Sequence, residues 1–347
     1  MAMDKSPLYC AQNVNRSVSA KPKLLVLELW ALGDLAIATP FLQAAEKQFD
    51  VTLLAKPHAL ELQKRFWPGI KTIPFTAPWT AFNGKYLFHK WPWRELSSLR
   101  KNLSAQRFEF GLSARHDPRD HFLLFGARVK QRLGFPRTGS RIFLTKPLVH
   151  PAPTQHRYEN WRVAGCALGI DLPKKNEISL PPSKPDGVVL IHTGAAKTAK
   201  LWPLEKYRSL LSKLRQHHYR VEMACDPQQR DWWLHAGENE VQTPRNISEL
   251  LEVIDRAAVF IGNDSGPGHL AALTGAPTFT LFGPAVPEWF VPMHPAAEFI
   301  PGKPCPYWPC NDYCHFPTPH CIWNHTEEEV WARVEIFLSA NLKRNKL

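Results

Sequence analysis

The feature that most constrains the fold is a unit that occurs three times: an apolar run, a turn with glycine, and a helical pattern. The apolar runs cover residues 24–29, 188–192 and 258–261. Continuous apolar runs of this length are typical of strands that are buried on both faces, as in parallel sheets. Strands that alternate with helices indicate an α/β protein. The turns after such strands lie where ligands bind in open α/β folds.

The turn after the third run is the most informative. It reads Asn263-Asp-Ser-Gly-Pro-Gly-His-Leu-Ala-Ala272, and we expect a small-residue helix to start near Gly268. Unpaired backbone N–H groups and the positive end of the helix dipole meet there, and glycines let a phosphate approach the backbone. The alternative is an ordinary turn in which Asp264 or Ser265 caps the helix. This turn alone does not decide between the two.

The other two turns carry charged side chains. Asp34 follows the first run, and a carboxylate there can accept a proton from a hydroxyl nucleophile, although Asp34 can equally be a helix cap. The second run leads into a loop of small residues with Lys197 and Lys200, before a helix expected at 204–218. Two lysines can neutralise a diphosphate without a metal. The alternative is that both are solvated surface lysines.

Together these segments resemble glycosyltransferase family nine, the ADP-heptose:lipopolysaccharide heptosyltransferases. The resemblance extends over about residues 22–335, and its motifs occur in the family's order. It implies the GT-B fold, in which two doubly wound, Rossmann-like domains face a central cleft. The residues that carry it are Leu32-Gly33-Asp34 with Thr39-Pro40, Lys200-x-Trp202-Pro203, Gly262-Asn-Asp-Ser-Gly266 with His269-Leu-Ala-Ala272, and Leu281-Phe-Gly-Pro284.

Proline and lysine are concentrated in residues 173–187, which we interpret as a linker. A chain of 347 residues is long enough for two domains, each with its own core. We therefore expect a disordered N-terminal extension (1–21), an N-terminal acceptor-binding domain (22–172), the linker, a C-terminal nucleotide-sugar-binding domain (188–325), and a last helix in 326–347 that packs back across the domain boundary.

The resemblance implies an inverting transfer of heptose from ADP-heptose to a Kdo or heptose of the lipopolysaccharide inner core. Asp34 would deprotonate the acceptor hydroxyl. Asp226 would meet the ribose hydroxyls, as an acidic residue at a strand end commonly does. The acceptor would be bound by Arg119, Arg128 and Arg132. The full set of expected donor-binding residues is Thr193, Gly194, Lys197, Lys200, Asp226, Asp264, Ser265, Gly266, Gly268 and His269.

The formal net charge of +12 favours anionic partners. Nucleic acid is not expected, because zinc-finger spacing, a helix-turn-helix and an RNP motif are all missing from the sequence. An anionic glycolipid acceptor fits better. The first twenty residues lack an apolar signal region, so we expect a cytoplasmic protein, in peripheral contact with the inner membrane. The Pro-, Trp- and Phe-rich stretch 74–93 either rests on that membrane or fills the core.

Four cysteines, Cys305, Cys310, Cys314 and Cys321, lie close together in the sequence. They can hold a structural Zn²⁺, although disulfides or free thiols are equally compatible with their spacing. No cofactor is expected for catalysis, because the sequence has no Asp-x-Asp pair at a strand end to hold Mg²⁺ against a diphosphate.

The first turn departs from the family at Trp30, where a Ser-x-Leu-Gly-Asp type is more familiar. Donor and acceptor specificity can therefore differ from those of other members. Two alternatives remain: a glycosyltransferase of the same fold that uses another nucleotide sugar, and a non-catalytic nucleotide-sugar-binding protein.

Overall fold

The computed structural model describes residues 20–81, 84–184, 187–310 and 314–342. The chain divides into two compact units, the first ending at Pro173 and the second beginning at Lys174. This boundary falls at the start of the expected linker. Most of the expected N-terminal extension, residues 1–19, lies outside the described residues. Within the described residues, no helix is both long and apolar enough to cross a bilayer.

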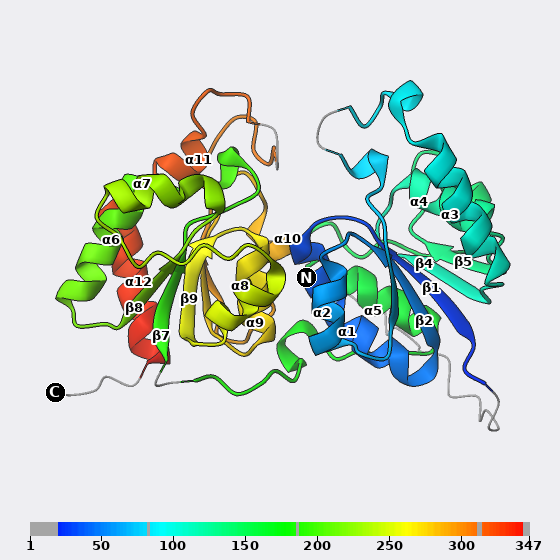
Figure 1. Cartoon of the computed structure of the whole chain (residues 1–347), viewed down its shortest axis with the longest axis horizontal. Helices are drawn as coiled ribbons and strands as arrows, with labels where there is room; N and C mark the ends of the chain where they lie inside the picture. Colours follow the sequence, from blue (N-terminus) through cyan, green and yellow to red (C-terminus); the bar gives the residue numbers. More distant parts are fainter. Residues whose placement is uncertain (1–19, 82–83, 185–186, 311–313, 343–347) are drawn as a thin grey trace, which may run out of the picture. The chain divides into compact units, whose positions relative to one another are not determined.

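The first unit is built on a parallel sheet with the strand order β3-β2-β1-β4-β5-β6. The order reverses between β1 and β4, which makes their carboxyl ends the switch point of a doubly wound sheet. Figure 1 shows α1, α2 and α5 on one face of the sheet and α3 and α4 on the other. The strands are β1 (Lys23–Glu28), β2 (Asp50–Ala55), β3 (Lys71–Pro74), β4 (Phe110–Ser113), β5 (Gln131–Gly134) and β6 (Lys146–Pro147). The helices are α1 (Leu32–Gln48), α2 (Ala59–Phe66), α3 (Trp93–Ala105), α4 (Pro118–Gly126) and α5 (Tyr158–Ala167), with 3-10 turns η1 (Pro78–Thr80), η2 (Phe88–Lys90) and η3 (Ser140–Phe143).

Side-chain alternation along β1 explains why both faces of this sheet are covered. Leu25 and Leu27 belong to a buried cluster with Leu103 of α3 and Leu124 of α4. Leu24 and Val26 are also fully buried, and successive side chains of a strand point to opposite faces. Helices on both faces are therefore required.

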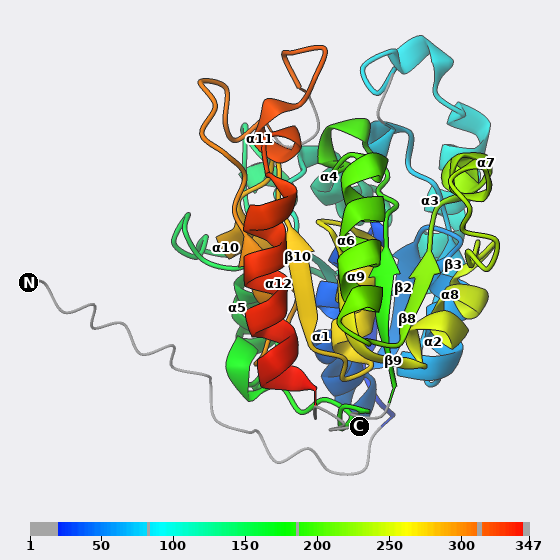
Figure 2. The same cartoon turned by 90° about the vertical axis from the view of Figure 1, so that its left-hand side faces the viewer.

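The second unit has the parallel order β11-β10-β9-β7-β8, which reverses between β7 and β9. Figure 2 shows α6 and α12 side by side in front of this sheet, and both contribute to its core. The strands are β7 (Val188–His192), β8 (Val221–Ala224), β9 (Ala257–Asn263), β10 (Thr278–Leu281) and β11 (Glu298–Ile300). The helices are α6 (Leu204–Gln216), α7 (Arg230–His235), α8 (Ile247–Ile254), α9 (Gly266–Leu273), α10 (Pro287–Phe290), α11 (His320–Trp323) and α12 (Glu327–Asn341), with 3-10 turns η4 (Lys175–Glu177), η5 (Thr198–Lys200) and η6 (Pro227–Gln229).

The predicted α/β architecture with two doubly wound sheets is confirmed. Helix α1 begins at Leu32, earlier than the sequence indicates, so Asp34 lies in its first turn. Helix α9 begins at Gly266 rather than near Gly268. Helix α12 packs its buried residues into the core of the second unit. Its packing across the domain boundary stays a prediction.

Candidate functional site

Asn263 joins the two strand ends at the switch point of the second unit. Its Nδ2 donates to the carbonyl oxygen of Thr193 at 2.9 Å. Its Oδ1 accepts from the backbone N–H of Trp202 at 3.1 Å and from the Tyr207 hydroxyl at 3.0 Å. The side chain is 1% exposed, so these hydrogen bonds replace water. They fix the loop after β7 against the end of β9.

Lys200 and Asp264 form an ion pair beside this loop. The distance from Lys200 Nζ to Asp264 Oδ2 is 2.7 Å, and the side chains are 20% and 5% exposed. Both residues were predicted to bind the donor, and the structure brings them together. A carboxylate this buried needs a cationic partner, so the ion pair with Asp264 holds the Lys200 ammonium group at the start of α9.

The first turn of α9 offers hydrogen-bond donors. Ser265 is the extended residue before the helix, and the first N–H groups of any helix lack intrahelical acceptors. The Ser265 hydroxyl is buried and has no hydrogen-bond partner among the described residues. Gly266 and Gly268 add no side chain to this turn. The His269 side chain is buried within α9. An anion at this helix end would meet donors and the positive end of the helix dipole.

Gly194 and Asp226 lie against each other. A Cβ atom on Gly194 would overlap the Asp226 carboxylate. This close approach of Asp226 therefore requires a glycine at position 194. The Gly194 N–H donates to Nδ1 of His192 at 3.2 Å. Burial lowers the pKa of His192, so the imidazole stays neutral and can accept this hydrogen bond. The loop is thus shaped to receive Asp226 from the end of β8.

Thr193 ties its loop to η6 and α7. Its side chain is fully buried, and its hydroxyl donates to Gln229 Oε1 at 2.9 Å and accepts from Trp233 Nε1 at 3.2 Å. The donor contact expected of Thr193 stays a prediction. The donor contact expected of half-buried Lys197, just before η5, stays a prediction.

In the first unit, Asp34 pairs with Arg115 at the switch point between β1 and β4. Arg115 Nη1 lies 2.7 Å from Asp34 Oδ1, and the side chains are 23% and 18% exposed. The other carboxylate oxygen accepts the Ala31 N–H at 3.3 Å. The Arg115 guanidinium also lies over the Trp30 ring, 4.4 Å from its centroid. Trp30 is thus the platform for Arg115.

Sequence reasoning missed Arg115. A signal was present, because Arg115 follows a strand, β4, as directly as Asp34 follows β1. Only the order of the strands, with β4 next to β1, brings the two side chains together.

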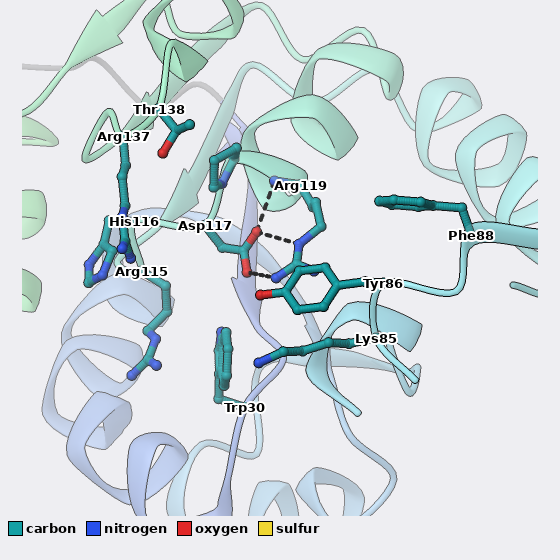
Figure 3. Close-up of a pocket in the computed structure, with 11 residues that line it drawn as sticks. Trp30, Lys85, Tyr86, Phe88, Arg115, His116, Asp117, Arg119, Arg137 and Thr138 are labelled. Carbon is teal, nitrogen blue, oxygen red and sulfur yellow. Dashed lines mark hydrogen bonds and ion pairs between the residues drawn. The ribbon is translucent and has the colours of Figure 1, made fainter. Parts of the chain in front are cut away.

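A cavity of about 570 Å³ opens beside this pair (Figure 3). Four of its lining side chains are cationic, and its carboxylate, Asp117, is held by Arg119 through hydrogen bonds of 2.8 and 2.7 Å. Burial acts to raise the pKa of Asp117, but the bonds from Arg119 outweigh it and the pKa is lowered. The residues around the cavity are Trp30, Lys85, Tyr86, Phe88, Arg115, His116, Asp117, Pro118, Arg119, Arg137 and Thr138.

The electrostatics of this cavity favour an anion. The pKa of His116 is lowered to about 4, first by burial and then by nearby positive charges, among them Arg115 and Arg137. The imidazole is therefore neutral at physiological pH. A ligand with a phosphate or carboxylate would relieve the repulsion among the arginines.

Arg128 and Arg132 do not join Arg119 at this cavity. Arg128 precedes β5, so it lies at the amino edge of the sheet, opposite to Asp34. Arg132 lies within β5, and its guanidinium donates to the carbonyl oxygens of Phe143 at 2.6 Å and Val129 at 2.7 Å. Binding of the acceptor by Arg128 and Arg132 stays a prediction.

Of the four clustered cysteines, Cys321 is buried, and Cys305, Cys310 and Cys314 are half-buried. The pKa of Cys321 is raised to about 11, first by burial and then by the other three. Across the described residues, which omit 311–313, no three His, Cys, Asp or Glu side chains are arranged to hold a metal ion. Zinc binding by these cysteines, one of the alternatives that their spacing allows, stays a prediction.

This chain is similar to proteins of a known family. The model of glycosyltransferase family 9 (heptosyltransferase) matches residues 96–311. Lipopolysaccharide core heptosyltransferase OpsX of Haemophilus influenzae is 23% identical over 291 residues, which are 76% of this chain and 79% of that protein. Lipopolysaccharide heptosyltransferase 3 of Escherichia coli is 29% identical over 188 residues, or 46% of this chain and 54% of that protein.

Solved structures share the fold. The family 9 glycosyltransferase of Veillonella parvula has a TM-score of 0.73 and 18% identity, covering 94% of this chain and 100% of that one. Heptosyltransferase WaaC of E. coli with ADP has a TM-score of 0.70 and 17% identity, covering 91% and 99%. At these identities the likeness concerns the fold.

Proposed function

The chain belongs to glycosyltransferase family 9, and we propose that it moves heptose from ADP-heptose to a Kdo or heptose of the lipopolysaccharide inner core, with inversion at the anomeric carbon. The observation that carries this proposal is the meeting of Lys200 with Asp264, 64 residues apart in the sequence, at the start of α9. The relatives named heptosyltransferases support the sugar and the acceptor class.

The donor is proposed to bind in the second unit. Lys200 and the N–H groups of Ser265, Gly266 and Gly268 would hold the diphosphate, with Asp226 at the ribose. Negative charge grows on the diphosphate as its bond to the anomeric carbon breaks, and fixed donors stabilise that charge without reorganising. A lysine and a helix end suffice for this role, so the proposed transfer needs no metal.

Asp34 is proposed to be the general base. Its carboxylate has about four acceptor directions, and the hydrogen bonds from Ala31 and Arg115 use two. A remaining direction can accept the proton of the acceptor hydroxyl while its oxygen attacks the anomeric carbon. The new glycosidic bond forms, the bond to the diphosphate breaks, ADP leaves, and the proton stays on Asp34.

The acceptor is proposed to be an anionic glycolipid. Arg119, Arg137 and Lys85 surround the cavity beside Asp34, where they can meet phosphate or carboxylate groups of an inner core. The proposed setting is the cytoplasm, in peripheral contact with the inner membrane.

Release of ADP from ADP-heptose tests the function, with Kdo-lipid A and a heptosylated core as alternative acceptors. Acceptor-dependent release is the expected result. Turnover with another nucleotide sugar but not with ADP-heptose would contradict the heptose assignment. Donor binding with no turnover on either acceptor would favour a non-catalytic binding protein instead.

Lys200→Met tests the donor site separately. Affinity for ADP should fall about tenfold or more, because a charge-assisted contact to the diphosphate is lost. Lys213→Met, in α6 of the same unit, is the matched control and should bind as the wild type does. A thermal melt of both variants excludes unfolding as the cause. Unchanged ADP affinity in Lys200→Met would contradict the assignment.

A further inference from the structure

Residues 84–94, here named the aromatic segment, expose a group of large apolar side chains. The exposed fractions are 68% for Tyr86, 42% for Leu87, 53% for Phe88 and 55% for Trp93. Single exposed apolar residues are ordinary, but several close together mark an interaction surface. Figures 1 and 2 show the segment beyond the carboxyl ends of the strands of the first unit, before α3.

The segment is held in a defined conformation. The Trp93 indole N–H donates to the carbonyl oxygen of Phe88 at 2.8 Å. The Trp91 ring lies 4.9 Å from Phe88, 5.5 Å from Trp93 and 5.6 Å from Trp79, centroid to centroid. Trp79 is 4% exposed and donates from Nε1 to buried Asp120 at 2.9 Å. Trp79 and Trp91 thus anchor the segment to the core, while Phe88 and Trp93 pack on Trp91 and each remain more than half exposed.

This division resolves the two interpretations of the stretch 74–93. Trp79 is buried, and Phe75 and Trp91 pack on the core, as the core interpretation expects. Tyr86, Leu87 and Phe88 remain at the surface. Burial in the core therefore accounts for part of the stretch but not for its exposed side chains.

Cations accompany the exposed rings. Lys90 and Arg94 are exposed, and Lys85 lies with its Nζ 5.3 Å from the centre of the Tyr86 ring. Within residues 84–94 the sequence has no acidic residue. Aromatic rings beside lysine and arginine are the composition that settles at the headgroup level of bilayers with anionic lipids.

The segment is continuous with the cavity beside Asp34. Lys85, Tyr86 and Phe88 belong to both, and Figure 3 shows Lys85 and Tyr86 reaching into the cavity from the segment. A surface that rests on lipid would therefore bring the mouth of this cavity to the headgroups.

We propose that the aromatic segment is a membrane-contact surface that inserts its exposed apolar side chains into the interface of a bilayer containing anionic lipids. The proposal deepens the proposed function, because it names the surface on which a lipid-linked acceptor would be met. Lys90 and Arg94 attract the anionic headgroups, and Leu87, Phe88 and Trp93 enter among them.

Sedimentation of the full chain with vesicles tests the proposal without any donor or acceptor, so its failure is distinct from a failure of the proposed function. The vesicles contain phosphatidylcholine alone or with phosphatidylglycerol. Leu87→Ser/Phe88→Ser/Trp93→Ser should lower the partition coefficient on the mixed vesicles about tenfold or more, since one immersed aromatic side chain accounts for about that factor. The matched control replaces three other exposed apolar residues: Phe122→Ser/Ile142→Ser/Ile336→Ser.

A charge variant tests the same surface independently, in case the Leu87→Ser/Phe88→Ser/Trp93→Ser variant does not fold. Lys90→Glu/Arg94→Glu should also lose about tenfold on the mixed vesicles, whereas Arg208→Glu/Arg220→Glu, with the same change of net charge in the second unit, should lose clearly less. Thermal melts check that all four variants fold.

Three results would overturn the proposal. One is a wild type that stays in the supernatant at every phosphatidylglycerol fraction. Another is equal binding of the aromatic variant and its control. Finally, size-exclusion chromatography can show a dimer that the aromatic variant dissolves while vesicle binding persists, which would assign the surface to a second copy of the chain.

Discussion

Replacing Glu28 with glutamine tests the titration of the buried carboxyl group at the end of β1. Glu28 ends β1, is 3% exposed, and accepts the Trp30 N–H on Oε1 at 3.2 Å. Its pKa is raised from 4.5 to about 8, first by burial and next by the negative charge of Asp34. At pH 7 the side chain is therefore protonated, and it adds no second negative charge beside the Asp34–Arg115 pair.

The sign and size of the effect follow from this shift. Below about pH 4.5 the carboxyl is protonated in the folded and unfolded chain, and its contribution to stability is complete. Between pH 4.5 and about 8, unfolding releases the proton, so the free energy of unfolding falls as pH rises. One pKa unit corresponds to about 1.4 kcal/mol, so Glu28 should lower the free energy of unfolding by about 3 kcal/mol between about pH 5 and pH 8.

Urea unfolding of the wild type and Glu28→Gln at both pH values measures this loss. Glutamine keeps an acceptor for the Trp30 N–H and cannot ionise, so the variant should lack the fall that Glu28 causes. Glu205→Gln, exposed at the start of α6, is the matched control and should follow the wild type. The reasoning is refuted if Glu28→Gln loses as much stability as the wild type across the same pH interval.

Three further predictions concern the two switch points. Gly194→Ala should weaken ADP binding about tenfold by calorimetry, because its Cβ displaces the Asp226 carboxylate, whereas the Ala196→Gly control should bind normally. Arg115→Lys keeps the charge but loses the planar group that stacks and pairs, so kcat should fall about tenfold with donor affinity intact; an unchanged kcat would show that the arginine does not position the base. Asn263→Ala removes the acceptor of the Trp202 N–H and of the Tyr207 hydroxyl, and one of the two donors to the Thr193 carbonyl oxygen, so it should lower the free energy of unfolding by about 3 kcal/mol in urea. A loss below about 1 kcal/mol would contradict its bridging role.

Much of the fold could be predicted because its strands are short, apolar and buried on both faces. The expected strand 188–192 coincides with β7, and 24–29 differs from β1 by one residue. The start of α1 was harder to predict, because the residue before it, Ala31, has no side chain that can cap the helix. The Asp34 carboxylate accepts a hydrogen bond from the Ala31 N–H instead. The edge strands β3 and β6 escaped prediction, since each is short and contains proline.

The site could be predicted only where its residues lie in one motif or in segments of the same family pattern. Lys200 and Asp264 were singled out in this way, and the structure pairs them. Arg115 was missed because its contact with Asp34 depends on the order of strands in the sheet. Arg119 lies in the first turn of α4 and Arg128 just after its end, so the length of this helix separates two residues that are close in sequence. The burial of Thr193 and the hydrogen bonds of its hydroxyl depend likewise on the folded structure.

The rate of the chemical step in Asp34→Asn tests the central claim most directly. With ADP-heptose and acceptor both saturating, the single-turnover rate should fall about a hundredfold to ten-thousandfold relative to the wild type, because the acceptor hydroxyl loses its base. ADP-heptose affinity should stay within about twofold of the wild type, since Asp34 lies outside the proposed donor site. Asp171→Asn, an exposed carboxylate of the same unit, should react at the wild-type rate. An Asp34→Asn variant that turns over as fast as the Asp171→Asn control would contradict the account.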